Sequence, residues 1–119
     1  MIKHMHRDFA SDVFLLFETV GAKLKIQNYM AAAPKIISLQ QFLNEDMKGT
    51  VIVSVMLPPR NYSYRIYTEK VAPRAQNAHA IVNAGFLYKL DAHARVKECR
   101  IVYGGLSSVF IRAFKTESH

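Results

Sequence analysis

Cysteine is nearly absent from this sequence. The chain has 119 residues and a single cysteine, Cys99. One thiol cannot close an internal disulfide, and by itself it cannot supply the ligands of a zinc site or an iron–sulfur cluster. The sequence therefore excludes a disulfide-stapled fold and a cysteine-built metal centre. A lone thiol fits a reducing compartment, and we expect a cytoplasmic protein.

Long hydrophobic runs are absent as well. No stretch approaches the ~20 apolar residues that a membrane-spanning helix requires. Residues 1–8 are polar and rich in histidine, unlike a secretory signal peptide. We therefore expect no membrane partner.

Several motifs that carry chemistry are missing. The sequence contains no Gly-x-Gly-x-x-Gly, Gly-x-x-x-x-Gly-Lys or Gly-x-Ser-x-Gly, so it shows no phosphate-cradling loop and no nucleophile elbow. His4 and His6 resemble a metal-ligand pair with Asp8 as a third ligand, but an exposed loop pair is the commoner explanation. Cys99 lies in an apolar stretch, where a free cysteine usually packs as a small hydrophobic residue. We assign no catalytic residue and no metal site.

Positive charge and apolar residues are what the chain does have. The formal net charge is +7 and half of the residues are hydrophobic, which suits one ordinary domain with a core. Such a charge fits an anionic partner, but it more often only keeps a surface soluble.

Tyrosines alternate with basic residues between residues 60 and 70, which raises the alternative of a small basic module that binds RNA or protein. On a strand, Tyr62 and Tyr64 would share one face while Tyr67 would point to the other, which weakens a base-stacking platform. We therefore expect no nucleic-acid partner.

The hydrophobic pattern predicts an α+β fold. Ser11 and Asp12 precede an apolar stretch and predict a capped helix that ends at Gly21. Ser38, with Gln41 three residues later, predicts a short second helix with a capping box. Alternating or β-branched runs predict strands at residues 22–29, 51–57, 62–67, 80–90, 96–103 and 109–114.

Short connections between these strands favour antiparallel neighbours, because a parallel pair needs a long crossover. We expect a mainly antiparallel sheet of about four strands with few helices. Residues 71–77 are predicted as a loop and residues 91–94 as a hairpin turn. The sequence stops just after a strand, without the helices that would complete a second layer, so we expect a truncated two-layer domain.

Three stretches resemble the flavin domain of aldehyde oxidases and xanthine dehydrogenases. They are a Lys-x-x-x-Arg run at residues 70–74, the run QNAHAIVNAG at residues 76–85, and a Val-Lys-Glu-(x)4-Tyr-Gly-Gly run at residues 96–105. Looser likeness at residues 2–4, 11–22 and 38–58 extends the resemblance over nearly the whole chain. The wording of the second run is closer to aldehyde oxidase.

The resemblance implies an electron-transfer role. In this family, electrons pass from a molybdenum centre through two 2Fe–2S clusters to FAD, and then to oxygen or NAD. Residues 1–30 would be the tail of the FAD-binding domain, 31–50 a linker with a short helix, and 51–119 an incomplete CO dehydrogenase flavoprotein C-terminal-like domain. The chain would be a fragment, with FAD and the remaining domains of a homodimeric parent oxidoreductase as partners. The molybdenum cofactor and the 2Fe–2S clusters would bind elsewhere in the parent.

Three flavin contacts of the family fall on residues of this chain. Asp12 matches the position beside the ribityl region, Ile52 matches the apolar residue on the isoalloxazine ring, and Lys70 matches the lysine near the polar edge of the ring. Without the resemblance, Asp12 would be a helix cap, Ile52 a core residue and Lys70 a solvated charge. The glycine-rich loop that holds the FAD pyrophosphate is not in this sequence. We therefore expect the isolated chain to bind FAD weakly or not at all and to be inactive.

Overall fold

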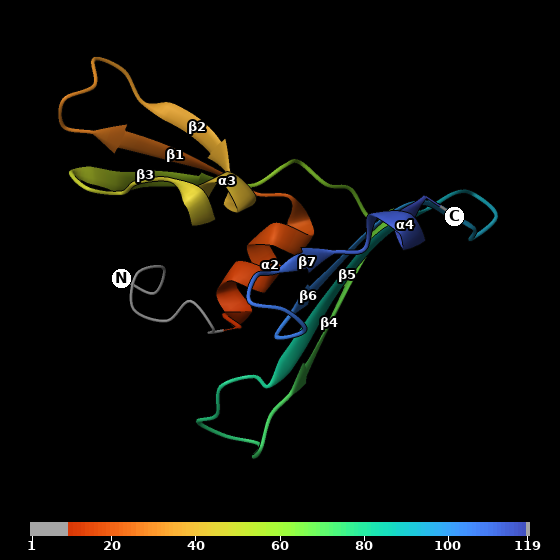
Figure 1. The fold of residues 1–119 in the computed structure, drawn as a ribbon. Coiled ribbons are helices and arrows are strands. Elements are labelled where there is room, and N and C mark those ends of the chain that lie inside the picture. The colour runs from red at the N-terminus through yellow and green to blue at the C-terminus, as the bar shows by residue number, and fades with distance from the viewer. Residues whose placement is uncertain (1–9, 119) are drawn as a thin grey trace.

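Two antiparallel sheets, with a helix between them, dominate the described part of the chain (Figure 1). The computed structural model describes residues 10–118. The small sheet has the strand order β2-β1-β3 and the large sheet has the order β4-β5-β6-β7. This confirms the predicted α+β class, although the strands divide between two sheets. The histidine pair at His4 and His6 and the likeness at residues 2–4 lie outside the described residues.

Helix α2 (Asp12–Val20) begins and ends where the sequence predicts. At its start, Ser11 Oγ accepts a hydrogen bond from the amide of Phe14 at 3.2 Å. At its end, Gly21 adopts the left-handed conformation with φ 72°, and its amide donates to the carbonyl of Glu18. Glycine takes this conformation without the steric cost of a Cβ, which is why the helix stops there.

The small sheet follows directly from α2. It contains β1 (Lys23–Asn28), β2 (Lys35–Ser38) and β3 (Thr50–Met56), with the short helix α3 (Leu39–Asn44) between the last two strands. The predicted capping box of α3 is present, because Ser38 and Gln41 exchange hydrogen bonds of 3.1 and 2.8 Å. Strand β2 was not predicted, because four residues are too few to show a period and the strand exists through its pairing with β1. The buried core of this half is Ala22, Leu24, Ile26, Ile37 and Leu39.

Strand β3 pairs with β1, with Ile26 opposite Ile52. We expected this strand to join the later strands in one sheet. The chain instead leaves β3 through residues 57–63, which include two prolines. Proline cannot donate to a strand ladder, so this segment breaks the sheet rather than turning into it. The chain then enters the large sheet.

The large sheet contains β4 (Tyr64–Val71), β5 (Val82–Leu90), β6 (Val96–Gly104) and β7 (Ile111–Arg112), followed by the short helix α4 (Phe114–Glu117). Strand β4 begins later and runs farther than predicted, so Lys70 and Val71 lie in a strand, paired with Asn83 and Val82. The residues near the end of β4 are polar, so the hydrophobic pattern did not indicate that the strand continues there. The last predicted strand was too long: only two of its residues pair, and Phe114 begins a helix.

Helix α2 forms a second layer on one face of the large sheet (Figure 1). Along β5, Asn83, Gly85 and Leu87 are buried and alternate with half-buried residues. A Cβ placed on Gly85 would lie 2.0 Å from Thr19 Oγ1, so the helix approaches the strand closely. The N-terminus of α2 is thereby set beside the end of β4 and the start of β5.

Candidate functional site

Asp12 and Lys70, two of the three residues that the family resemblance singles out, are in contact. Lys70 Nζ lies 2.8 Å from Asp12 Oδ2. Asp12 is the first residue of α2, and Lys70 lies near the end of β4. The carboxylate side chain is 48% exposed and the lysine side chain 40%. Both groups therefore remain accessible to a ligand while holding one another in place.

A third residue completes this cluster. Asn83 lies opposite Lys70 on β5 and is 1% exposed. Its Nδ2 donates to Asp12 Oδ1 at 2.9 Å and to the carbonyl of Ala10 at 3.0 Å. The two oxygens of Asp12 thus have separate partners. Sequence reasoning assigned no role to Asn83, whose signal was its place in the run at residues 76–85.

The electrostatics of the cluster favour an ionised Asp12. Partial burial alone would raise the pKa of this carboxyl, but hydrogen bonds from Lys70 and Asn83, together with the charge of Lys70, outweigh burial and lower its pKa. His79 adds a smaller contribution in the same direction. The position of Asp12 in the first turn of α2 also suits a negative charge, because the helix N-terminus carries partial positive charge.

Ile52, the third residue, lies in the other sheet. It occupies β3, and the structure does not bring it to Asp12 and Lys70 as a contact. Its side chain is 47% exposed, so it is not a fully buried core residue. The structure therefore offers an apolar surface on the small sheet and a polar pair formed between α2 and the large sheet.

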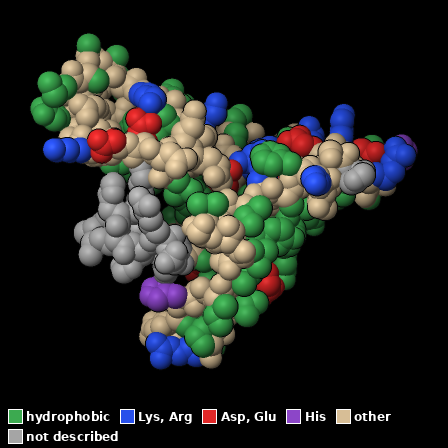
Figure 2. All heavy atoms as spheres, in the orientation of Figure 1, with side chains coloured by type: hydrophobic (Ala, Val, Ile, Leu, Met, Phe, Trp, Pro, Cys, Tyr) green, Lys and Arg blue, Asp and Glu red, His purple; other side chains and the backbone are tan. Residues whose placement is uncertain are grey.

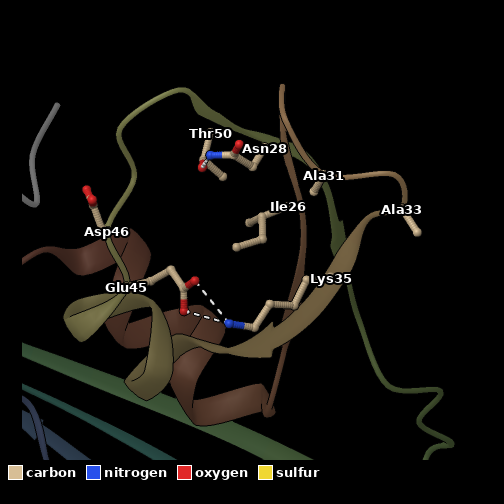
Figure 3. Close-up of a pocket in the computed structure, with 8 residues that line it drawn as sticks. All are labelled: Ile26, Asn28, Ala31, Ala33, Lys35, Glu45, Asp46 and Thr50. Atoms are coloured by element: carbon tan, nitrogen blue, oxygen red, sulfur yellow. Dashed lines mark hydrogen bonds and ion pairs between the residues drawn. The ribbon is translucent and has the colours of Figure 1, made fainter.

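A separate hollow lies in the small sheet, between β1 and the segment that follows α3 (Figure 3). Its polar groups bind one another: Lys35 Nζ lies 3.0 Å from Glu45, and Asn28 Nδ2 donates to Thr50 Oγ1 at 2.8 Å. Its volume of about 140 Å³ is below the ~300 Å³ at which small-molecule sites begin. The hollow is therefore not a credible cofactor pocket.

Other candidates from the sequence gain no support as sites. Between residues 10 and 118, no group of three or more His, Cys, Asp or Glu side chains is arranged to hold a metal ion. Cys99 is half-buried, and its thiol lies 3.8 Å from the carbonyl of Glu117. In the same described range, none of the helices has the length and apolar character to cross a membrane.

The tyrosines of the predicted aromatic stretch do not form one platform. Tyr64 and Tyr67 lie three positions apart on β4 and therefore point to opposite faces, as predicted. Tyr62 precedes the strand, so the expectation that it shares a face with Tyr64 through strand alternation was wrong. Tyr64 instead lies 4.4 Å from the guanidinium of Arg60 and 5.3 Å from Lys89 Nζ, measured to the ring centre.

Comparison with known proteins finds similarity in both fold and sequence. The fold matches a chain of the carbon monoxide dehydrogenase from Hydrogenophaga pseudoflava that lacks the Mo-pyranopterin moiety of its cofactor, with a TM-score of 0.80 at 16% identity over 98% of this chain. A cyanide-inactivated Cu,Mo-CO dehydrogenase gives a TM-score of 0.80 at 13% identity over the same share. Aldehyde oxidase 4 of Cavia porcellus is 30% identical over 69 residues. The sequence profile of the CO dehydrogenase flavoprotein C-terminal domain matches residues 67–119. Residues 67–119 thus resemble a domain of this molybdo-flavoenzyme family in sequence, and the fold resembles it over nearly the whole chain.

These comparisons confirm the resemblance drawn from the sequence. The profile of the CO dehydrogenase flavoprotein C-terminal domain begins inside β4, so it covers Lys70 and Asn83 but neither Asp12 nor Ile52. The chain spans 5% of the length of aldehyde oxidase 4 and 41% of each CO dehydrogenase chain. It therefore corresponds to a small part of aldehyde oxidase 4 and to less than half of each CO dehydrogenase chain.

Proposed function

We propose that this chain forms one side of an FAD site in a larger oxidoreductase of the aldehyde oxidase and xanthine dehydrogenase type. The observation that carries the proposal is the contact between Lys70 and Asp12, which come from different elements yet remain half exposed. In this proposal, Asp12 faces the ribityl hydroxyls, Lys70 faces the polar edge of the flavin ring, and Ile52 packs against the ring.

The chemistry of these residues fits a flavin. An ammonium group has three N–H donors, and the contact with Asp12 engages one of them, which leaves others for a ligand acceptor. An ionised carboxylate accepts hydrogen bonds from hydroxyl groups, and both oxygens of Asp12 have lone pairs left after their contacts with Lys70 and Asn83. The exposed side chain of Ile52 supplies the apolar contact.

FAD, when bound, supplies the acceptance and release of electrons. Lys70 then places a positive charge beside the ring, where it stabilises negative charge on the reduced flavin. The chain itself contributes binding and electrostatics. We assign it no catalytic residue and no substrate chemistry.

The setting of the chain follows from the same proposal. Residues 1–30 belong to the end of an FAD-binding domain, 31–50 to a linker, and 51–119 to the C-terminal-like flavoprotein domain. The partners are FAD and the other domains of a homodimeric, cytoplasmic enzyme. The molybdenum cofactor and the 2Fe–2S clusters of that enzyme bind outside this segment.

The proposal is tested by titrating the ¹⁵N-labelled chain with FAD and recording amide chemical shifts. NMR detects weak binding, which is the strongest that we expect of this segment alone. The largest shifts should fall around Asp12, Ile52 and Lys70. Replacing Lys70 with Ala should weaken FAD binding about tenfold, because it removes a charge-assisted hydrogen bond.

Two controls keep this test specific. ADP carries the phosphates without the flavin ring and should leave the amide of Ile52 unshifted. Lys97→Ala removes the same charge near the hairpin end of β6, away from Lys70, and should bind FAD as the parent chain does. The proposal fails if FAD and ADP give the same shifts, or if the two lysine variants cannot be told apart.

A further inference from the structure

The row of residues that crosses the large sheet beneath the start of α2 is unusual in its polarity. Lys70 on β4 lies opposite Asn83 on β5, and Asn83 lies opposite Gly104 on β6. Asn83 is among the most deeply buried side chains in the described residues. A polar amide in such a place needs a reason, because burial of polar groups is unfavourable without full hydrogen bonding.

The amide of Asn83 is only half satisfied. Its Nδ2 donates to Asp12 Oδ1 and to the carbonyl of Ala10. Its Oδ1 has no hydrogen-bond donor among residues 10–118. The reverse orientation would set the amide oxygen against two other oxygens, so the two acceptors fix which way the amide faces.

The sheet leaves room for this orientation. A Cβ placed on Gly104 would lie 2.3 Å from Asn83 Oδ1 and 2.5 Å from the ring of Phe110. The missing side chain of Gly104 therefore gives the space that the amide oxygen occupies. Asn83 holds its place despite an unsatisfied oxygen, so stability of the fold alone does not explain it.

We propose that Asn83 is a positioning residue of the flavin site. Its Nδ2 donates to Oδ1 of Asp12 and so holds the ionised carboxylate in one orientation. That orientation directs Oδ2 of Asp12 to Lys70 and the remaining lone pairs of the carboxylate toward the ligand. This inference rests on the proposed function. Asn83 itself is buried and does not touch the ligand.

The test uses two variants that differ by one donor. Asn83→Thr and Asn83→Val give side chains of nearly the same shape, but only threonine carries a hydrogen-bond donor. The first readout is the pKa of Asp12, followed through its ¹³C carboxyl resonance. The Val variant should raise this pKa toward the ordinary aspartate range, and the Thr variant should restore part of the depression. The second readout is FAD binding by NMR, which should weaken about five- to tenfold in the Val variant and less in the Thr variant.

A measurement on the parent chain guards against variants that fail to fold. The side-chain NH₂ resonances of Asn83 should titrate with the same midpoint as the carboxyl of Asp12. Independence of these two titrations, or identical pKa and FAD affinity in the Thr and Val variants, overturns the inference. If the parent chain shows the coupled titration but no flavin-specific shifts, the proposed function fails and Asn83 still positions Asp12.

Discussion

At the scale of single residues, the chain contains a buried ion pair between Glu18 and Arg100. Glu18 on α2 is 3% exposed and accepts a hydrogen bond from the guanidinium of Arg100 on β6. The Nε of Arg100 also donates to the carbonyl of Glu18 at 2.7 Å, near the negative end of the helix. Burial raises the pKa of Glu18 more than the charge of Arg100 lowers it. Ionised Glu18 is therefore held at a net cost.

The raised pKa of Glu18 predicts how the stability of the chain, relative to Glu18→Gln, changes with pH. The pKa of Glu18 is higher in the folded chain than in the unfolded chain, so the folded chain binds the carboxyl proton of Glu18 more tightly. The contribution of this proton to the free energy of unfolding is therefore complete at low pH. That contribution is lost as pH rises from about 4.3 through the folded pKa. The stability of the parent relative to the variant should therefore grow as pH falls from 7 toward 4.5, by about 1.4 kcal/mol for each unit between the two pKa values. Urea unfolding at several pH values measures it.

The matched control for this experiment is Glu98→Gln, which removes a carboxylate that is more than half exposed. It corrects for the loss of one negative charge at the surface. A parent chain whose advantage over Glu18→Gln stays constant or shrinks on acidification would contradict the raised pKa of Glu18.

At the scale of elements, the close approach of α2 to β5 decides how tightly the helix can hold the site. The approach is possible because Gly85 has no side chain. The same helix covers the hydrophobic residues of the small sheet through Phe14 and Phe17. One short helix therefore connects both halves, and a change in its distance from β5 moves Asp12 relative to Lys70.

We expect Gly85→Ala to destabilise the chain by about 1–3 kcal/mol, because the new methyl group overlaps Thr19 and forces α2 away from the sheet. Chemical denaturation of both chains measures the difference. In the double variant with Thr19→Ala, the cost of Gly85→Ala should fall, because the atom nearest to the new methyl group is gone. Simple additivity of the two changes would show that the overlap is not the cause.

The elements themselves were largely predictable where the pattern was local. Helix α2 and its glycine stop, the capping box of α3, and the β5–β6 hairpin all follow from short-range signals. The end of β4 did not, because polar residues at 68–70 carry no strand pattern and pair only because β5 lies beside them. The site shared this limit: Asp12 and Lys70 were named through family resemblance, while their contact across 58 positions and the role of Asn83 needed the fold.

At the scale of the whole molecule, the small sheet leaves an apolar edge uncovered. Strand β3 lies at the end of the strand order, and residues 51–56 are all exposed in the described part of the chain. Hydrophobic side chains also gather over the β4–β5 side of the large sheet (Figure 2). An exposed apolar edge strand is a template for pairing with another chain.

We expect the isolated chain to self-associate through β3, and Val53→Lys to suppress this association at least severalfold, because a charge at an edge strand opposes pairing. Sedimentation velocity over a range of concentrations measures it. Tyr62→Lys is the matched control, since it adds the same charge at an exposed apolar residue outside any strand. Equal suppression by both variants would assign the effect to net charge rather than to the strand edge.

The hydrogen bonds around Asp12 join segments that are 58 to 73 positions apart in the chain. Loops of this length must close before any of these contacts can form, and the entropy of closure is lost first. The cluster therefore assembles late in folding and disappears whenever α2 leaves the large sheet. A ligand that binds only the assembled cluster stabilises the whole fold by mass action. Under the function proposed above, bound FAD would act as a clamp that holds α2 against the large sheet.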